Sequence, residues 1–219
     1  MNDCEKGVVV LHLEVLAEES SLREVLLNLL PKILPQDVEF NVHSFQGKKN
    51  LLKQLPNRLK GYSEWIPEDW RIVVLIDEDR QDCYELKQNL ENIAEQAGFL
   101  TRSCCPKWQD VQVLNRIIVE ELEAWFFGDV DAICQAYPRV SANLANNKKY
   151  RDPDAIKGGT WEALEGVLKR AGYYQGGLEK IKVAREISHF MNPVVNRSPS
   201  FQVFYKGLLN ICAGNFDCL

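Results

Sequence analysis

Stretches of apolar residues alternate with stretches of helical periodicity along the first 140 residues. A nearly continuous apolar run that is rich in β-branched residues is typical of a strand covered on both faces, and strict alternation is typical of a half-buried strand. By these patterns we expect strands at Val8–Leu16, Val38–Phe45, Arg71–Ile76 and Val111–Val119, with a short one near Thr101–Cys105.

Helical patterns fill the segments between these strands. We expect helices at residues 21–34, 83–97 and 120–138, and a short basic helix or turn at 48–59 followed by an aromatic, proline-bearing loop at 62–70. Ser21 with Glu24, and Asp82 with Glu85, have the spacing of a capping box at a helix start. Strands that alternate with helices predict an α/β fold with a mostly parallel central sheet and helices on both faces.

Past Val140 the strand patterns stop and helical segments follow at 161–171, at 178–190 and after Pro199. We therefore divide the chain into an α/β core at residues 1–140 and a helical, basic extension at 141–219 that packs on the core. Whether that extension is a separate domain stays open at this point.

The 219 residues are 46% hydrophobic and 26% charged, the composition of an ordinary folded protein, which excludes disordered and collagen-like chains. The net charge of −5 by itself argues against a polyanionic partner. The charge is uneven, however: residues 146–206 hold 11 basic and six acidic residues, and residues 41–63 hold five basic residues and no acid. Two basic regions therefore lie within an acidic protein.

Targeting and redox features are weak in this sequence. No apolar run is long enough to span a membrane and the first residues lack a signal-peptide pattern, so we expect a cytoplasmic protein. The seven cysteines are scattered, without a C-x-x-C pair or a zinc-type cluster, and we expect them to be reduced thiols.

Acidic residues follow three of the predicted strands. In parallel α/β sheets ligands bind at the carboxyl ends of the strands, and hard cations such as Mg²⁺ prefer oxygen ligands. Two ions held there would suit hydrolysis of a phosphodiester, with the basic stretches contacting the polyanion. The three clusters are Glu18 and Glu19; Asp77, Glu78, Asp79 and Asp82; and Glu120, Glu121 and Glu123, with Asp129 beyond.

If the third strand continues through them, Asp77 and Asp79 face the same way, because side chains alternate along a strand. Each acidic cluster also has a structural interpretation, since acidic residues after strands often cap helices. Glu14 competes with Glu18 as the first carboxylate. The three histidines are isolated, and each fits a core or surface position.

The order of these acidic motifs resembles the Toprim fold of topoisomerases, primases and OLD-family nucleases. More narrowly, the chain resembles a family of bacterial Toprim-like proteins of the domain-of-unknown-function type. The resemblance covers about residues 8–130 and rests on Ala17-Glu18-Glu19-Ser20-Ser21, Asp77-Glu78-Asp79 and Glu123-Ala124-Trp125.

The resemblance implies Mg²⁺- or Mn²⁺-dependent phosphodiester chemistry. It makes Glu18 a general acid/base or a metal ligand, Asp77 and Asp79 metal ligands, and Glu123, with Glu121, a second-site carboxylate. The sequence departs from the general Toprim pattern at residues 17 and 19, a departure that the narrower family shares. A second departure, at residues 80–82, argues against topoisomerase-like activity. An ATPase partner in phage defence or genome maintenance is expected by analogy.

We therefore expect a metal-dependent nuclease or nuclease subunit. The alternatives are a non-catalytic regulatory subunit that binds nucleic acid or an ATPase, and a small-molecule phosphohydrolase. The catalytic residues expected are Glu18, Lys48 and Lys157; the metal ligands are Glu18, Asp77, Asp79, Asp82, Glu121 and Glu123; and the nucleic-acid contacts are Lys48, Lys49, Lys53, Arg151, Lys157 and Arg197.

Overall fold

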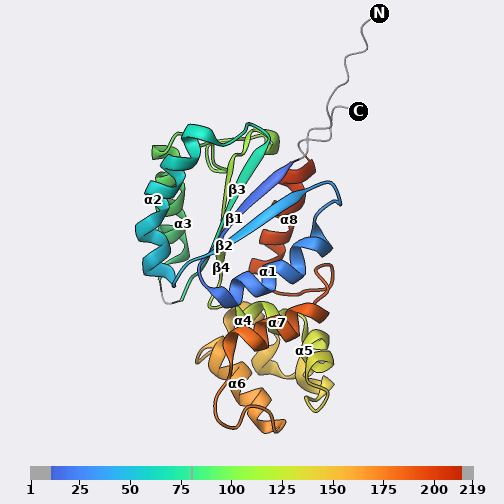
Figure 1. The fold of residues 1–219 in the computed structure, drawn as a ribbon. Coiled ribbons are helices and arrows are strands. Elements are labelled where there is room, and N and C mark those ends of the chain that lie inside the picture. The colour runs from blue at the N-terminus through green and yellow to red at the C-terminus, as the bar shows by residue number, and fades with distance from the viewer. Residues whose placement is uncertain (1–10, 80, 214–219) are drawn as a thin grey trace, which may run out of the picture.

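The computed structural model describes residues 11–79 and 81–213, and its centre is a four-stranded, all-parallel sheet (Figure 1). The order of the strands across the sheet is β2-β1-β3-β4, so the third strand inserts between the first and the fourth. Their bounds are β1 (His12–Ala17), β2 (Glu39–Ser44), β3 (Trp70–Asp77) and β4 (Val113–Ile118). The predicted α/β class with a parallel sheet is confirmed.

Helices cover both faces of the sheet, which explains the continuous apolar runs of the inner strands. Alternate residues of β3 contribute to two separate cores: Val73 and Leu75 belong to one, and Ile72, Val74 and Ile76 belong to the other. The first core contains residues of α1 (Ser20–Ile33) and α8 (Pro199–Ala213), and the second contains residues of α2 (Lys48–Trp65) and α3 (Cys83–Gln96).

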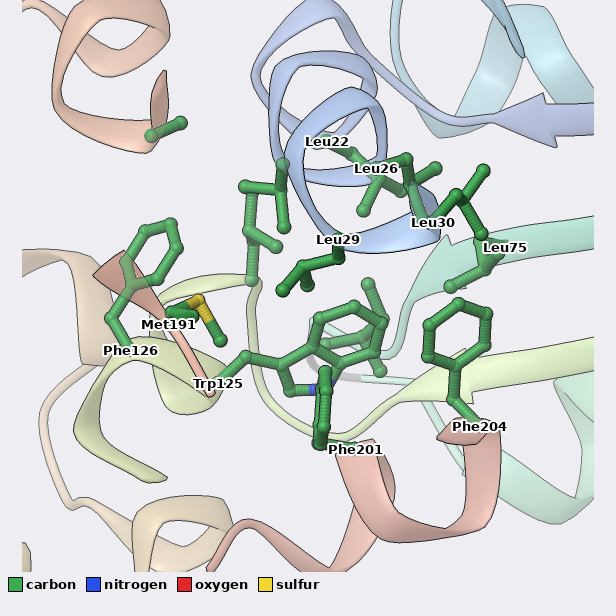
Figure 2. Close-up of a cluster of buried hydrophobic side chains, with 14 of the residues drawn as sticks. Leu22, Leu26, Leu29, Leu30, Leu75, Trp125, Phe126, Met191, Phe201 and Phe204 are labelled. Atoms are coloured by element: carbon green, nitrogen blue, oxygen red, sulfur yellow. The ribbon is translucent and has the colours of Figure 1, made fainter. Parts of the chain in front are cut away.

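The larger core is organised around Trp125, which lies among leucines of α1 and aromatic residues of α8 (Figure 2). The Trp125 ring stacks on Phe204 at 5.1 Å between centroids and meets Phe201 edge-on at 5.0 Å. Its indole Nε1 donates to Ser200 Oγ at 3.1 Å. The tryptophan of the E-A-W motif therefore attaches the last helix to the segment that follows β4.

Short helices form a lobe beyond the carboxyl ends of the strands (Figure 1). They are α4 (Glu123–Gly128), α5 (Val130–Ala136), α6 (Thr160–Arg170) and α7 (Lys180–Phe190), with 3₁₀ turns at Ala142–Asn146, Lys148–Tyr150 and Pro153–Ala155; a further 3₁₀ turn, Trp108–Asp110, precedes β4. α7 packs on α1, where Lys32 Nζ donates to the carbonyls of Ser188 and Met191. The chain then returns to the sheet through α8, which packs on β4.

Four local predictions differ from the structure. No strand forms at 101–105, because the chain turns back there and only Thr101 bridges to Val113. The helix expected at 120–138 is broken at Asp129, whose side chain accepts a hydrogen bond from Ala132 N and starts α5. α2 extends to Trp65, through residues expected to form a loop.

The fourth difference concerns the start of α1. Glu19, not Ser21, is the N-cap residue, and the Ser21 hydroxyl donates to the Glu19 carboxylate instead of capping the helix. By contrast, Asp82 caps α3 as expected. Residues 8–10 of the first predicted strand lie outside the described residues.

No helix in the described residues is long and apolar enough to cross a membrane. Five of the cysteines lie in the described ranges and are free thiols: Cys83, Cys104, Cys105, Cys134 and Cys212.

Candidate functional site

Glu18 follows β1 directly and holds three elements together. Its Oε2 accepts a hydrogen bond from Asp77 N at 2.9 Å, and its Oε1 accepts one from Lys48 N at 3.0 Å. The side chain is buried, and burial together with the negative charge of Asp79 raises its pKa in spite of these hydrogen bonds. Of the two candidates for the first carboxylate, Glu18 and not Glu14 thus contacts the end of β3.

Asp77, the last residue of β3, is buried among other carboxylates. Its Oδ1 has no hydrogen-bond partner within the described part of the chain. Burial raises its pKa well above the ordinary value, and the charges of Glu18 and Glu123 add to the rise. A buried carboxylate oxygen without a donor is costly unless a proton or a cation compensates its charge.

Glu123, the first residue of α4, brings a third carboxylate to the same place. Burial raises its pKa to about 7, although the charge of Lys180 opposes the rise. Burial alone would lower the pKa of Lys180, but the charges of Glu123 and Glu19 outweigh burial and raise it. A cation from α7 therefore faces the acidic cluster.

Lys180 is the residue of this site that the sequence did not single out. It appeared only as one of the basic residues of the C-terminal third. No local motif marks it, because it reaches the carboxylates through the packing of α7 against α1.

Asp79 does not share the setting of Asp77. β3 ends at Asp77, and Asp79 has a left-handed backbone with φ of 53°, so the expected alternation through both residues is wrong. The Asp79 carboxylate is half exposed and pairs with Lys48 Nζ at 2.7 Å. Lys48 Nζ also donates to the Glu78 carbonyl at 2.9 Å, which ties the start of α2 to the loop after β3.

In two other expected metal ligands, one carboxylate oxygen caps the start of a helix. Asp82 Oδ1 accepts from the backbone N–H groups of Tyr84 and Glu85 at the start of α3. Glu121 Oε2 accepts from the N–H groups of Thr160 and Trp161 at the start of α6. The alternative that acidic residues after strands cap helices therefore holds for Asp82 and Glu121.

An open cleft of about 720 Å³ lies beside the buried carboxylates. Its walls come from the start of α2, the loops after β3 and β4, and the glycine turn before α6. The lining includes Lys48, Lys49, Asp79, Glu121 and Gly159. Glu18, Asp77 and Glu123 do not line it, because they are buried.

The six basic residues expected to contact nucleic acid are divided by the fold. Lys48 and Lys49 line the cleft, and Lys157 is exposed next to Gly158 at its rim. The remaining three are exposed but do not line it: Lys53, Arg151 and Arg197. Lys48, expected to be catalytic, is thus adjacent to Glu18, whereas Lys157 lies outside the lining of the cleft, next to Gly158.

Across residues 11–79 and 81–213 there is no group of three or more His, Cys, Asp or Glu side chains placed to hold a metal ion. The donor chemistry nevertheless fits a hard cation: the cluster offers only carboxylate oxygens, and Asp77 Oδ1 is not engaged. A cation would also reverse the charge repulsion that helps to raise the pKa of Asp77.

The fold and the site define an α/β protein with a parallel sheet and buried carboxylates gathered at the carboxyl ends of its strands. A family model described as "Domain of unknown function (DUF4276)" matches residues 17–209, so the chain belongs to that family. No curated protein matches the chain.

Among solved structures, the chain is similar to the C-terminal region of the Xanthomonas campestris pv. campestris OLD protein. The TM-score is 0.48 at 16% sequence identity, and the match covers 93% of this chain and 97% of that one.

Proposed function

We propose that this protein hydrolyses phosphodiester bonds in nucleic acid with the help of Mg²⁺ or Mn²⁺, as a nuclease or as a subunit of one. The observation that carries the proposal is Asp77. Its buried carboxylate has an oxygen without a donor and lies within the electrostatic reach of Glu18 and Glu123, beside a cleft with lysines on its wall. The Toprim-like order of the acidic motifs supports the same chemistry.

In this proposal Asp77 and Glu123 hold the metal, with Glu18 and Asp79 beside them. The ion, when bound, supplies charge stabilisation and lowers the pKa of a coordinated water. Because Glu18 already accepts two backbone hydrogen bonds, its first role is to hold the ends of β1, β3 and α2 at a defined distance. Asp82 and Glu121 stay in their helix caps.

Two lysines complete the site. Lys48 lines the cleft and is held by Asp79 and the Glu78 carbonyl, so its charge is positioned to stabilise a phosphate. Lys180 faces Glu123 from the helical lobe and limits the repulsion among the carboxylates. Carboxylates that would bind a cation thus lie beside a cleft whose wall carries a lysine that would bind an anion.

Cleavage assays of the purified full chain test this function. Plasmid and single-stranded substrates are incubated with Mg²⁺, with Mn²⁺ or with a chelator. We expect cleavage in the presence of the metals, and a loss of roughly a hundredfold or more in Asp77→Asn, because that change removes a ligand charge. Asp131→Asn, an exposed aspartate on α5, is the matched control. Equal cleavage by Asp77→Asn and the wild type would contradict the proposal.

A second candidate is a regulatory subunit that binds nucleic acid or an ATPase without catalysis. It is favoured by the engagement of Glu18, Asp82 and Glu121 oxygens with backbone donors. Binding that is unchanged by chelator, with no cleavage in either metal, would support it. An ATPase partner and a role in phage defence or genome maintenance belong to the proposal through the Toprim resemblance alone.

A further inference from the structure

A groove runs between the edge strand β2 and helix α2, on the face of the sheet that α2 and α3 cover. It consists of two hollows of about 560 and 400 Å³. His43 of β2 and Arg58 of α2 line both hollows, so the two are adjacent. Nothing in the proposed catalytic chemistry uses these residues.

The α2 wall of the groove is a stripe of polar and aromatic residues. Asn50, Gln54, Arg58 and Trp65 recur at intervals of four and seven, which places them on one face of the helix. At the helical rise per residue, the stripe is about 22 Å long. The cleft takes Lys48, Lys49 and Leu52 from the same helix, and these residues lie on the opposite face of α2 from the stripe.

The far end of the groove is an aromatic corner. Trp65 is 58% exposed, and its ring contacts Tyr62 at 5.5 Å and Trp70 at 5.8 Å between centroids. Trp70 stacks in turn on the buried His12 at 3.8 Å. Aromatic rings supported in this way form a rigid platform for a planar ligand.

Buried Glu14 organises the middle of the groove. Its Oε2 accepts from His43 Nε2 and from the Tyr62 hydroxyl, both at 2.7 Å, and its Oε1 accepts from Asn41 Nδ2 at 3.1 Å. Burial alone would raise the pKa of Glu14, but its hydrogen bonds outweigh burial and lower it. The charge of Glu14 is thus satisfied internally, and its effect is to fix His43 and Tyr62.

Charge complementarity identifies an anionic occupant. Arg58 lines both hollows, and the one carboxylate among the described residues of their lining, Glu14, is buried and accepts hydrogen bonds from His43 and Tyr62. Arg58 Nε donates to the Tyr62 hydroxyl at 3.2 Å, and this bond holds the guanidinium beside the aromatic corner. A ligand that fits here therefore carries both flat rings and negative charges along one direction.

We propose that this groove binds single-stranded nucleic acid, with bases stacked on Trp65 and Trp70 and a backbone phosphate at Arg58. The inference rests on the proposed function and adds strand preference to it. In a duplex the base faces are occupied by stacking, so only an unpaired strand can use the tryptophans.

Fluorescence anisotropy of labelled oligonucleotides in EDTA tests the groove without catalysis. We expect single strands to bind more tightly than the matching duplex. Trp65→Ala should weaken binding of single strands about fivefold to a hundredfold, whereas Trp65→Phe should retain most of the affinity. Arg58→Gln should weaken binding and reduce the slope of log affinity against log salt concentration by about one.

Phe190→Ala, an exposed aromatic residue of α7 outside the groove, is the matched control and should bind as the wild type does. Circular dichroism of each variant verifies folding. Preference for the duplex, or equal binding by Trp65→Ala and the wild type, would overturn the inference.

The groove and the proposed function fail independently. Cleavage with metal but no effect of Trp65→Ala on binding would contradict the proposal for the groove and support the proposed nuclease activity. Binding that depends on Trp65, without cleavage in any metal, would support the proposal for the groove and contradict the proposed nuclease activity.

Discussion

Two buried carboxylates beside the cleft, Glu123 and Asp77, make the stability of the fold depend on pH. Glu123 has a pKa of about 7 in the folded protein, above the ordinary value of 4.5, because it is buried. Burial also raises the pKa of Asp77. Carboxylates in this state bind protons more readily in the folded than in the unfolded chain, so they make stability depend on pH.

Glu123 should make the protein less stable as the pH rises from about 4.5 to 7. The folded state keeps the proton over this range and the unfolded state loses it, so the stabilisation present at low pH is lost. Relative to the wild type, Glu123→Gln should gain up to about 3 kcal/mol in unfolding free energy between pH 4.5 and pH 8. Urea unfolding at several pH values measures the gain, and a constant difference between the two proteins would contradict it.

Asp77 should couple stability to divalent metal. If Mg²⁺ or Mn²⁺ binds only the folded chain, an ion concentration a hundred times the Kd adds about 2.7 kcal/mol to its stability. Thermal unfolding of the wild type should therefore shift upward with metal, and the shift should vanish in Asp77→Asn. Asp131→Asn should shift as the wild type does. A metal-independent melting temperature in the wild type would remove this prediction.

At the scale of elements, side chains from one segment start or anchor the next. Glu121 caps α6, and the indole of Trp125 donates to Ser200 at the start of α8. These contacts join residues about 40 and 75 positions apart. The acidic and aromatic residues after β4 thus stabilise the fold in addition to any role at the cleft.

Glu121→Ala should lower the unfolding free energy by about 1–2 kcal/mol, because the start of α6 loses its acceptor. Lys60→Ala, an exposed residue of α2, should change it by less than about 0.5 kcal/mol. Chemical denaturation of both variants compares them. Equal stabilities would show that the cap contributes nothing.

At the scale of the whole molecule, the C-terminal third is interleaved with the sheet. α7 packs on α1, and α8 supplies Phe201 and Phe204 to the core around Trp125 (Figure 2). Lys180 reaches the carboxylates only because this packing holds α7 at the strand ends. The basic extension is therefore part of the site as well as of the fold.

A chain truncated after residue 198 should not fold, because it exposes the apolar surface that α8 buries. Loss of the buried Phe201 and Phe204 side chains alone should lower the unfolding free energy by several kcal/mol. Expression with solubility and thermal unfolding measures the effect. A truncated chain that melts cooperatively near the temperature of the full chain would contradict it.

Local pattern alone determined the parallel α/β class, the bounds of most strands and helices, and the three acidic clusters. Buried strands require continuous apolar runs, and turns after them collect polar residues, so both are visible in a window of a few residues. The same windows misplaced the start of α1 and the break at Asp129. Both depend on side-chain hydrogen bonds: the Ser21 hydroxyl donates to the Glu19 carboxylate, and Asp129 accepts from Ala132 N.

Only the tertiary structure decided which carboxylates meet. Asp77, Glu18 and Glu123 are brought together by strand order and by the entry of α4. Asp79 instead pairs with Lys48 at the cleft, and Asp82 and Glu121 cap helices. Lys180 and the groove at β2 have no sequence motif, because each arises from elements distant along the chain. Burial, and with it every shifted pKa, is a property of three-dimensional packing that a one-dimensional pattern does not contain.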